Sequence, residues 1–140
     1  MIMYFDMDGT LADLYTGEWL NKIEDRQTEP FDEANKLIAE EVLKSLAENY
    51  DLGIITWLPK DADKEYGERV RQSKINWLNK HYPDVPFKER HIVIYGTPKS
   101  KVARDKNGIL VDDENRHRDA WKGVAIKPEE VYNYLEGRNG

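Results

Sequence analysis

Four aspartates of the sequence come in two pairs, and each pair directly follows a short apolar run. They are Asp6 and Asp8 near the start of the chain and Asp112 and Asp113 near its end. Carboxylates that lie close together raise each other's pKa and oppose folding unless a positive charge compensates them. A hard divalent cation resolves that conflict, and Mg²⁺ prefers oxygen ligands. If the fold brings the two pairs together, the sequence therefore predicts a Mg²⁺ site held by aspartates.

A hydroxyl group and two ammonium groups follow two further apolar runs. Thr56 closes one of these runs, whereas Lys99 and Lys101 come shortly after the other. A lysine beside a carboxylate cluster supplies positive charge and can also contact a phosphate oxygen. Both lysines compete for this role, and we favour Lys99 because it follows Pro98 at an expected helix start. Gly9 suits a turn in which the backbone swings close to a ligand.

Each of these features has an ordinary structural interpretation when it is considered alone. Asp8-Gly9 after a strand is typical of a turn, and a threonine that ends a strand commonly caps a helix. The acidic residues at 112–114 suit the start of a helix, where carboxylates favour the dipole. Thr97-Pro98 is typical of an N-cap followed by a first-turn proline. Together these interpretations require four coincidences in the same order, so we favour one shared site.

To position these side chains, the apolar runs must be strands of one sheet. The five runs are 2–5, 53–55, 92–95, 109–111 and 124–126. None alternates cleanly between apolar and polar residues, which is typical of strands covered on both faces in a parallel sheet. Helical patterns separate the runs, over 34–49, from 66 to just before Pro83, over 115–121 and over 128–135.

This alternation predicts an α/β fold, namely a three-layer α/β/α sandwich of Rossmann-like type with a parallel sheet of about five strands. In such sheets ligands bind beyond the carboxyl ends of the strands. The aspartates, the threonine and the lysines all stand at those ends, so the fold and the site are predicted together.

The composition limits the class of protein. The chain has 140 residues and no cysteine, which suits one compact domain and excludes disulfides and a thiol nucleophile. We expect a cytoplasmic protein with no membrane partner, because the start lacks a signal-peptide pattern and no apolar stretch approaches the roughly 20 residues that span a bilayer. The formal net charge of −6 disfavours binding to duplex nucleic acid. It permits a small phosphorylated substrate, because a bound divalent cation can reverse the sign locally.

Four segments, in this order, resemble the four motifs of the haloacid-dehalogenase-like (HAD) superfamily of phosphohydrolases. They are Asp6-Met7-Asp8-Gly9-Thr10-Leu11, Ile54-Ile55-Thr56, Lys99, and Ile109-Leu110-Val111-Asp112-Asp113. The resemblance covers the chain from its first expected strand to about residue 126. The segments around 109–115 and 120–125 look closest to the 5′(3′)-deoxyribonucleotidase branch and its phage and bacterial relatives.

The resemblance implies a mechanism. Asp6 would be the nucleophile and would form an aspartyl-phosphate, while Asp8 would act first as general acid and then as general base. Thr56, with the backbone N–H of Trp57, would hold the phosphoryl oxygens, and Lys99 would balance their charge. An acid at position 8 favours phosphate-ester chemistry over dehalogenation.

The resemblance also implies a metal site and further contacts. Mg²⁺ would be held by Asp6, by Asp8 through its carbonyl oxygen, and by Asp112. Asp113 would be a further ligand or a partner of the ligands. Candidate substrate contacts are the remaining groups beside these motifs, namely Gly9, Thr10 and Trp57.

Many members of the superfamily insert a cap domain that selects the substrate. Here only about 13–30 remains for a cap, fewer than the roughly 40 residues that usually fold alone. We therefore expect a single domain over 1–140 with no substantial cap and an open site. Trp57 is expected either to stack on a nucleobase or sugar or to lie in the core. Tyr15 and Trp19 are expected to pack on the surface rather than to form the opposite wall of the site.

Several basic residues receive no role in the site. Arg69, Arg71 and Lys74 lie in a segment rich in opposite charges, which is typical of a solvated helix face. The histidines show no metal-ligand spacing or nucleophile partner and are assigned no chemistry: His81, His91 and His117.

The leading hypothesis is therefore a Mg²⁺-dependent phosphatase of phosphate monoesters, with nucleotides and deoxynucleotides as the first substrates to test. The sequence leaves the oligomeric state open. A polynucleotide end phosphatase is a second hypothesis, which an open site permits and the acidic charge disfavours. A phosphate-binding scaffold with little turnover is a third, and the complete set of motif residues argues against it.

Overall fold

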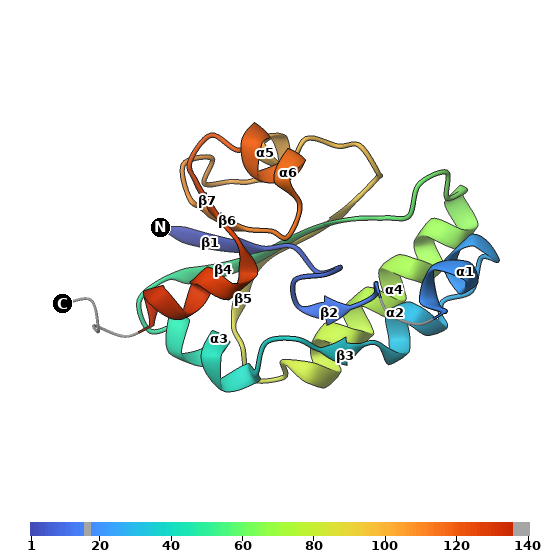
Figure 1. Ribbon diagram of the computed structural model, residues 1–140, viewed down its shortest axis with the longest axis horizontal. Coiled ribbons are helices and arrows are strands. Elements are labelled where there is room, and N and C mark those ends of the chain that lie inside the picture. The colour runs from blue at the N-terminus through green and yellow to red at the C-terminus, as the bar shows by residue number, and fades with distance from the viewer. Residues whose placement is uncertain (16–17, 136–140) are drawn as a thin grey trace.

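The computed structural model describes residues 1–15 and 18–135, and at its centre lies a five-stranded sheet in which every pairing is parallel (Figure 1). The strand order is β5-β4-β1-β6-β7. The five strands of this sheet have these bounds: β1 Ile2–Phe5, β4 Asp51–Trp57, β5 Phe87–Val93, β6 Ile109–Val111 and β7 Val124–Ile126.

Helices flank the sheet, with α5 and α6 above it in the view of Figure 1 and α3, α4 and the final 3₁₀ helix below it. The helices are mostly short, with α4 the exception. Their bounds are α1 Trp19–Glu24, α2 Glu29–Glu33, α3 Glu40–Leu46, α4 Lys64–His81, α5 Lys99–Val102, α6 Asn115–Ala120 and the 3₁₀ helix η1 Pro128–Tyr134.

The central strand β1 is buried on both faces because its side chains alternate between two hydrophobic clusters. Met3 and Phe5 belong to the larger cluster, to which α3 and α4 contribute. Ile2 and Tyr4 belong to the smaller one, where the Tyr4 ring meets the edge of Trp121 at a centroid distance of 5.8 Å. This two-sided burial explains the continuous apolar run and fixes the strand at the middle of the sheet.

The predicted strands are confirmed, with one correction to their bounds. β1, β6 and β7 have the predicted bounds, and β4 extends the predicted run at both ends. The run predicted at Ile92–Tyr95 is wrong at its end, because β5 runs over Phe87–Val93 and Ile94 is 71% exposed. β5 is an edge strand in which the four consecutive residues 88–91 are polar, so its first half carries no continuous apolar signal.

The helix predicted over 34–49 is also wrong in its first third. Ala34 and Ala39 both have extended backbones, and helix α3 begins only at Glu40. Between them Asn35–Lys36 forms a short strand, β3, which pairs antiparallel with β2 at Ala12–Asp13. The periodic apolar residues of this segment are therefore divided between a strand pairing and a helix.

The segment between β2 and β3 contains α1 and α2 and lies beside α4 (Figure 1). Phe31 of α2 is buried in the larger cluster, and the Tyr66 hydroxyl of α4 donates to the carbonyl oxygen of Gln27 at 2.8 Å. These contacts hold the described residues of the segment against α4. Among the described residues no helix combines the length and the apolar character that a membrane span requires.

Candidate active site

The first aspartate of each pair continues a strand ladder by one residue. The Asp6 N–H donates to the carbonyl oxygen of Val111 at 3.0 Å, and the Asp112 N–H donates to that of Ile126 at 3.1 Å. Because β1 and β6 are parallel neighbours, both side chains leave the sheet at the same edge. The topology therefore confirms that Asp6 and Asp112, one aspartate from each pair, meet at this edge.

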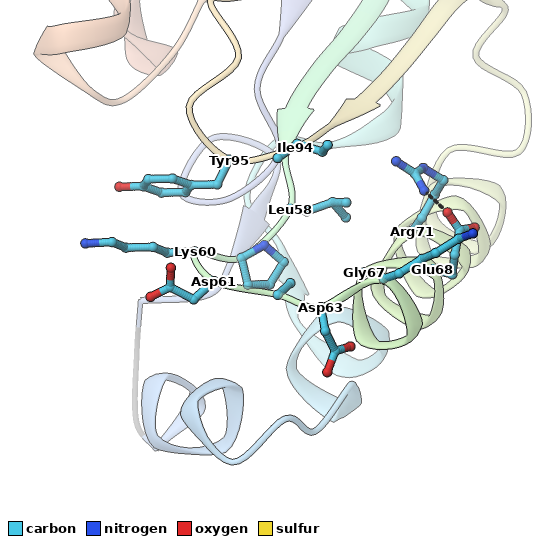
Figure 2. Close-up of a pocket in the computed structure, with 12 residues that line it drawn as sticks. Leu58, Lys60, Asp61, Asp63, Gly67, Glu68, Arg71, Ile94 and Tyr95 are labelled. Carbon is cyan, nitrogen blue, oxygen red and sulfur yellow. Dashed lines mark hydrogen bonds and ion pairs between the residues drawn. The ribbon is translucent and has the colours of Figure 1, made fainter.

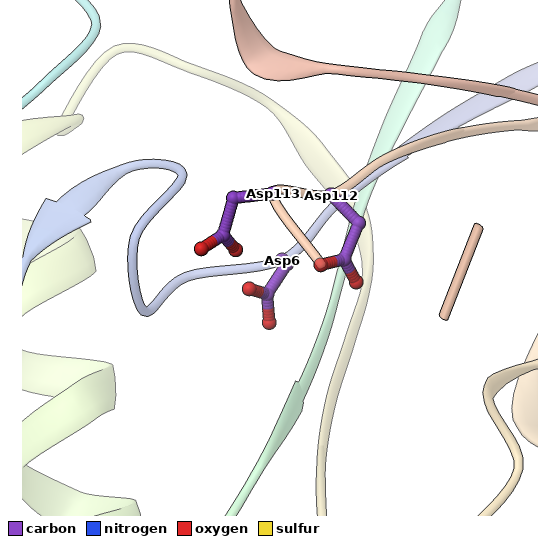
Figure 3. Close-up of side chains that lie close together, drawn as sticks. All are labelled: Asp6, Asp112 and Asp113. Atoms are coloured by element: carbon purple, nitrogen blue, oxygen red, sulfur yellow. The ribbon is translucent and has the colours of Figure 1, made fainter. Parts of the chain in front are cut away.

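Three of the four aspartates gather at this edge (Figure 3). Asp6, Asp112 and Asp113 each offer a carboxylate oxygen, and these oxygens lie within 4.8 Å of one another. Asp6 and Asp112 are buried and Asp113 is partly buried. Three carboxylates at this spacing could hold a metal ion, and they offer the oxygen ligands that hard divalent cations take.

Lys99 compensates the two buried members of this cluster. Its ammonium nitrogen lies 2.9 Å from Oδ1 of Asp6 and 2.8 Å from Oδ2 of Asp112, and it also donates to the carbonyl oxygen of Ile55 at 3.0 Å. Lys99 opens α5 and is buried, whereas Lys101 on the same helix is exposed. The structure therefore places Lys99, and not Lys101, in the site.

The electrostatics of the cluster are uneven. Burial raises the pKa of Asp6 well above its usual value, and the neighbouring Asp112 adds to this while Lys99 opposes it. Burial alone would also raise the pKa of Asp112, but hydrogen bonds from His117 and Lys99 hold it below its usual value. Asp112 is thus the better-compensated carboxylate, and Asp6 is the one that still lacks positive charge.

Lys74 is a site residue that the sequence analysis missed. It was expected on a solvated face of α4, but its side chain is only 1% exposed. Its ammonium nitrogen lies 3.2 Å from Oδ2 of Asp8, 2.7 Å from Oγ1 of Thr56 and 2.9 Å from the carbonyl oxygen of Trp57. A helical spacing signal was available, because Val70, Ser73, Lys74, Trp77 and Leu78 share the buried face of α4.

His117 is the second missed residue. Its Nδ1 lies 2.9 Å from Oδ2 of Asp112, so it orients the carboxylate that Lys99 also contacts. Its Nε2 is buried without a hydrogen-bond partner among the described residues and lies 3.5 Å from Oε2 of Glu114. A lone histidine five residues after Asp112 carries no recognisable spacing, so no sequence signal pointed to it.

The turn after β1 brings its backbone against Asp113. Gly9 has φ of +84°, and a Cβ at this position would lie 2.3 Å from Oδ2 of Asp113. Thr10 is fully buried and its hydroxyl donates to Oδ1 of Asp113 at 3.3 Å. The structure therefore places Thr10 against a carboxylate of the cluster, where it orients Asp113.

Trp57 lies at the rim of the site and is neither fully exposed nor part of the core. Its Nε1 donates to the carbonyl oxygen of Thr97 at 2.7 Å, and the Arg116 guanidinium lies 5.1 Å from the centroid of its ring. The rings of Tyr95 and His117 approach it edge-on at 4.7 and 4.5 Å. Three side chains therefore already contact the indole ring of Trp57. The ring forms part of the wall of the site and is not left free to stack on a base or a sugar.

A pocket of about 230 Å³ opens directly over Asp6 and Asp8. Its wall is largely apolar and comes from described residues between β2 and β3, from the end of β4 and the β4–α4 loop, and from the residues after β5 and β6. The apolar and aromatic lining residues are Leu14, Tyr15, Leu20, Ile23, Phe31, Trp57, Leu58, Pro59 and Tyr95. Tyr15 is 52% exposed, as expected for a surface residue, but it also lines this pocket, while Trp19 of α1 is absent from the described lining.

A second hollow of about 560 Å³ adjoins this pocket between the β4–α4 loop, the first turns of α4 and the residues after β5 (Figure 2). The two hollows share Leu58, Pro59, Lys60 and Tyr95. Charged groups of both signs line the larger one: Lys60, Lys64 and Arg71 against Asp61, Asp63 and Glu68. This balance gives no strong attraction for a polyanion.

The residues present fit a divalent cation. Four carboxylates, from both aspartate pairs, contact or adjoin the two buried ammonium groups of Lys74 and Lys99. When all four carboxylates are ionised, their formal negative charge exceeds the charge of the two ammonium groups by two, which is the charge that one divalent cation balances. Any larger residue at position 9 would block the close approach of the backbone to Asp113, so the glycine allows Asp113 to keep its place in the cluster.

Comparison with protein-family models finds no match for this chain, and a search of curated proteins finds none either. Function is therefore inferred from the geometry of the site.

Proposed function

We propose that this chain is a Mg²⁺-dependent phosphatase that hydrolyses phosphate monoesters through an aspartyl-phosphate on Asp6. One observation carries the proposal: Asp6, Asp112 and Asp113 converge at the carboxyl edge of a parallel sheet, with the Lys99 ammonium bridging the first two. This arrangement joins a carboxylate nucleophile to the positive charge that phosphoryl transfer requires.

Each residue has a defined task in the proposed reaction. A carboxylate oxygen of Asp6 forms a bond to phosphorus while the bond from phosphorus to the leaving oxygen breaks, and Asp8 gives its proton to that oxygen. Asp8 then takes a proton from water, which attacks the phosphorus of the intermediate and releases inorganic phosphate and free Asp6. Lys99 balances the charge of Asp6 during both steps.

The metal would be held by Asp6, the Asp8 carbonyl oxygen and Asp112, with Asp113 as a ligand or a partner of the ligands. When bound, Mg²⁺ supplies charge neutralisation for the phosphoryl oxygens. Thr56 and the backbone N–H of Trp57 would hold those oxygens, and Gly9 lets the backbone approach them.

The order of the motifs and the flanked parallel sheet support a place in the HAD superfamily, and with it a three-layer α/β/α sandwich forming a single domain over 1–140. The short segment at 13–30 supports a domain without a substantial cap. Its described residues contribute side chains to the pocket wall, so the site is partly enclosed rather than fully open. A cytoplasmic location belongs to the same proposal.

Nucleotides and deoxynucleotides are the first substrates to test, because the pocket over Asp6 is apolar and large enough to receive part of a leaving group. A polynucleotide end remains a second candidate, since the adjoining hollow extends the site. Its balanced charges and the net charge of −6 favour the smaller substrate.

The direct test is phosphate release from a panel of sugar phosphates, nucleotides and 3′-phosphorylated oligonucleotides, with Mg²⁺ or with a chelator. We expect turnover that needs Mg²⁺ and that falls at least about a thousandfold in Asp6→Asn. Asp51→Asn, the same change at an exposed residue that begins β4, is the matched control and should retain activity.

Two outcomes would contradict the proposal. Undiminished turnover by Asp6→Asn would exclude Asp6 as the nucleophile. No turnover of any phosphate ester, together with tight binding of Mg²⁺ or inorganic phosphate, would favour a phosphate-binding scaffold instead.

A further inference from the structure

Lys74 is a buried cation in the middle of α4, on the face that packs into the hydrophobic core. Its ammonium nitrogen also lies 5.6 Å from the centroid of the Phe31 ring. A buried charge is costly unless it is paired and hydrogen-bonded. A lysine at this position is therefore tolerated only because its partners compensate it, and those partners are site residues.

The hydrogen bonds of Lys74 leave it nothing to offer a substrate. An ammonium group has three N–H donors and no acceptor. Three acceptors lie within reach, namely Oδ2 of Asp8, Oγ1 of Thr56 and the carbonyl oxygen of Trp57. Because donors and acceptors match in number, Lys74 acts on a reaction through these partners.

The same contacts set the hydrogen-bonding role of Thr56. Lysine can only donate, so the Thr56 oxygen must accept from it, and the hydroxyl proton of Thr56 then remains available for another acceptor. A phosphoryl oxygen is an acceptor of that kind. Lys74 thereby directs Thr56 to act as a donor toward the ligand.

Among the described residues, the carboxyl group of Asp8 is held through one of its two oxygens. Its Oδ2 pairs with Lys74, while Oδ1 takes no part in that contact. Asp8 is partly exposed, with 24% of its side chain accessible, and it lines the pocket over Asp6. One oxygen thus fixes the carboxyl group, and the other is left to exchange a proton with a leaving group or a water.

We propose that Lys74 is a positioning residue that fixes Asp8 and Thr56 relative to each other. This inference rests on the proposed phosphatase function. The two buried lysines then divide the site between them. Lys99 contacts the nucleophile Asp6 and its neighbour Asp112. Lys74 contacts the acid–base residue Asp8 and Thr56, whose hydroxyl would hold the phosphoryl group.

The test is the dependence of Lys74→Met on the leaving group. The parameter kcat/KM reports cleavage of the bond to the leaving oxygen, and that step needs a proton from Asp8 only when the leaving group is poor. For an alkyl phosphate we expect kcat/KM to fall at least about tenfold more than for p-nitrophenyl phosphate, since general acid catalysis contributes roughly 10²–10⁴-fold. A purely structural role would lower both values by the same factor.

Two further variants sharpen the test. Arg71→Met removes another cation of α4 that bonds to the sheet through the Ile92 carbonyl oxygen, and it should leave the ratio between the two substrates unchanged. In an Asp8→Asn background, Lys74→Met should no longer alter that ratio, because the group it positions is gone. This double variant keeps the test valid where Lys74→Met alone folds less well.

The outcomes separate this inference from the function it rests on. Equal losses for both substrates in Lys74→Met, with wild-type turnover intact, would overturn the role of Lys74 and leave the phosphatase function standing. A wild-type protein that turns over neither substrate with Mg²⁺ would overturn both.

Discussion

The ammonium nitrogen of Lys99 lies 2.9 Å from Oδ1 of Asp6, although 93 positions separate the two residues in the chain. The pair is buried, with side-chain exposures of 3% and 9%. Burial alone would lower the pKa of Lys99, but Asp6 and Asp112 raise it above its ordinary value. The fold therefore keeps Lys99 protonated beside Asp6. A carboxylate nucleophile and a phosphate bound to it would require positive charge at that place.

Lys99→Met is expected to destabilise the protein strongly when divalent metal is absent. The change removes one partner of a buried ion pair and leaves Asp6 and Asp112 without it, and such losses typically cost about 3–5 kcal/mol. Mg²⁺ should restore part of the free energy of unfolding, because the cation takes over the missing charge. Urea denaturation with a chelator and with Mg²⁺ measures both effects.

Lys101→Met is the matched control for that experiment. Lys101 lies on the same helix, two residues away, but is exposed. Its substitution should change the free energy of unfolding by less than about 0.5 kcal/mol in either buffer. If Lys101→Met lowered the free energy of unfolding more than Lys99→Met does, the assignment of Lys99 as the lysine of the site would be wrong.

The parts of the site that were predictable are those that end buried strands. Asp6, Thr56 and Asp112 each follow a continuous apolar run, and parallel pairing forces such positions to one edge of the sheet. Lys99 was predictable because Pro98 marked a helix start. For these residues the local sequence and the strand topology both predict a position in the site.

The missed residues reach the site from within helices. Helical spacing aligns Lys74 with the buried residues of α4, but the many charged residues of the segment indicate a solvated face, and the packing of α4 decides between the two. His117 acts through its contact with Asp112, which depends on the turn that opens α6. The helix predicted from residue 34 failed for a related reason, since the pairing of β3 with β2 overrides its apolar spacing. Tertiary packing decides all three cases.

Glu89 should make stability depend on pH in the acidic range. Burial alone would raise its pKa, but hydrogen bonds from His91, the Arg104 backbone and the Tyr4 hydroxyl hold it below its ordinary value. A carboxyl group with a lowered folded pKa stabilises the protein above its unfolded pKa of about 4.3. That contribution is lost as the pH falls through the folded value.

Glu89→Gln should accordingly lower the free energy of unfolding by about 1–3 kcal/mol at pH 7, where hydrogen bonds to a charged group are lost. The difference from wild type should shrink as the pH is lowered from 5 toward 3. Urea denaturation across this range checks the trend. A gap that stays constant or widens toward low pH would show that the charge of Glu89 is not what stabilises the fold.

Leu20→Ser should weaken binding of substrates with an apolar leaving group. Leu20 lines the pocket over Asp6 and is 54% exposed, so the change removes apolar contact without opening the core. We expect KM for such a substrate to rise about fivefold, which corresponds to roughly 1 kcal/mol of lost contact. Inhibition by inorganic phosphate, which has no leaving group, should be unaffected.

Leu37→Ser provides the comparison, because Leu37 is 47% exposed and is absent from the described lining of the pocket. It should leave KM unchanged. If both variants raise KM equally, the effect comes from general destabilisation and the leaving group does not lie against Leu20.

Gly9→Ala should abolish Mg²⁺-dependent activity, and a matched glycine in the same protein separates the cause. Gly9 and Gly96 both have positive φ, +84° and +93°, so alanine carries a similar backbone cost of about 1–2 kcal/mol at either position. At Gly9 the new Cβ would lie 2.3 Å from Oδ2 of Asp113 and 2.7 Å from Cε2 of Tyr15, whereas at Gly96 it would meet nothing within 4 Å. Thermal unfolding should therefore shift in both variants, while Mg²⁺-induced stabilisation and phosphate release should be lost only in Gly9→Ala. Retention of both properties by Gly9→Ala would mean that Asp113 can move without consequence, and it would remove Asp113 from the proposed metal site.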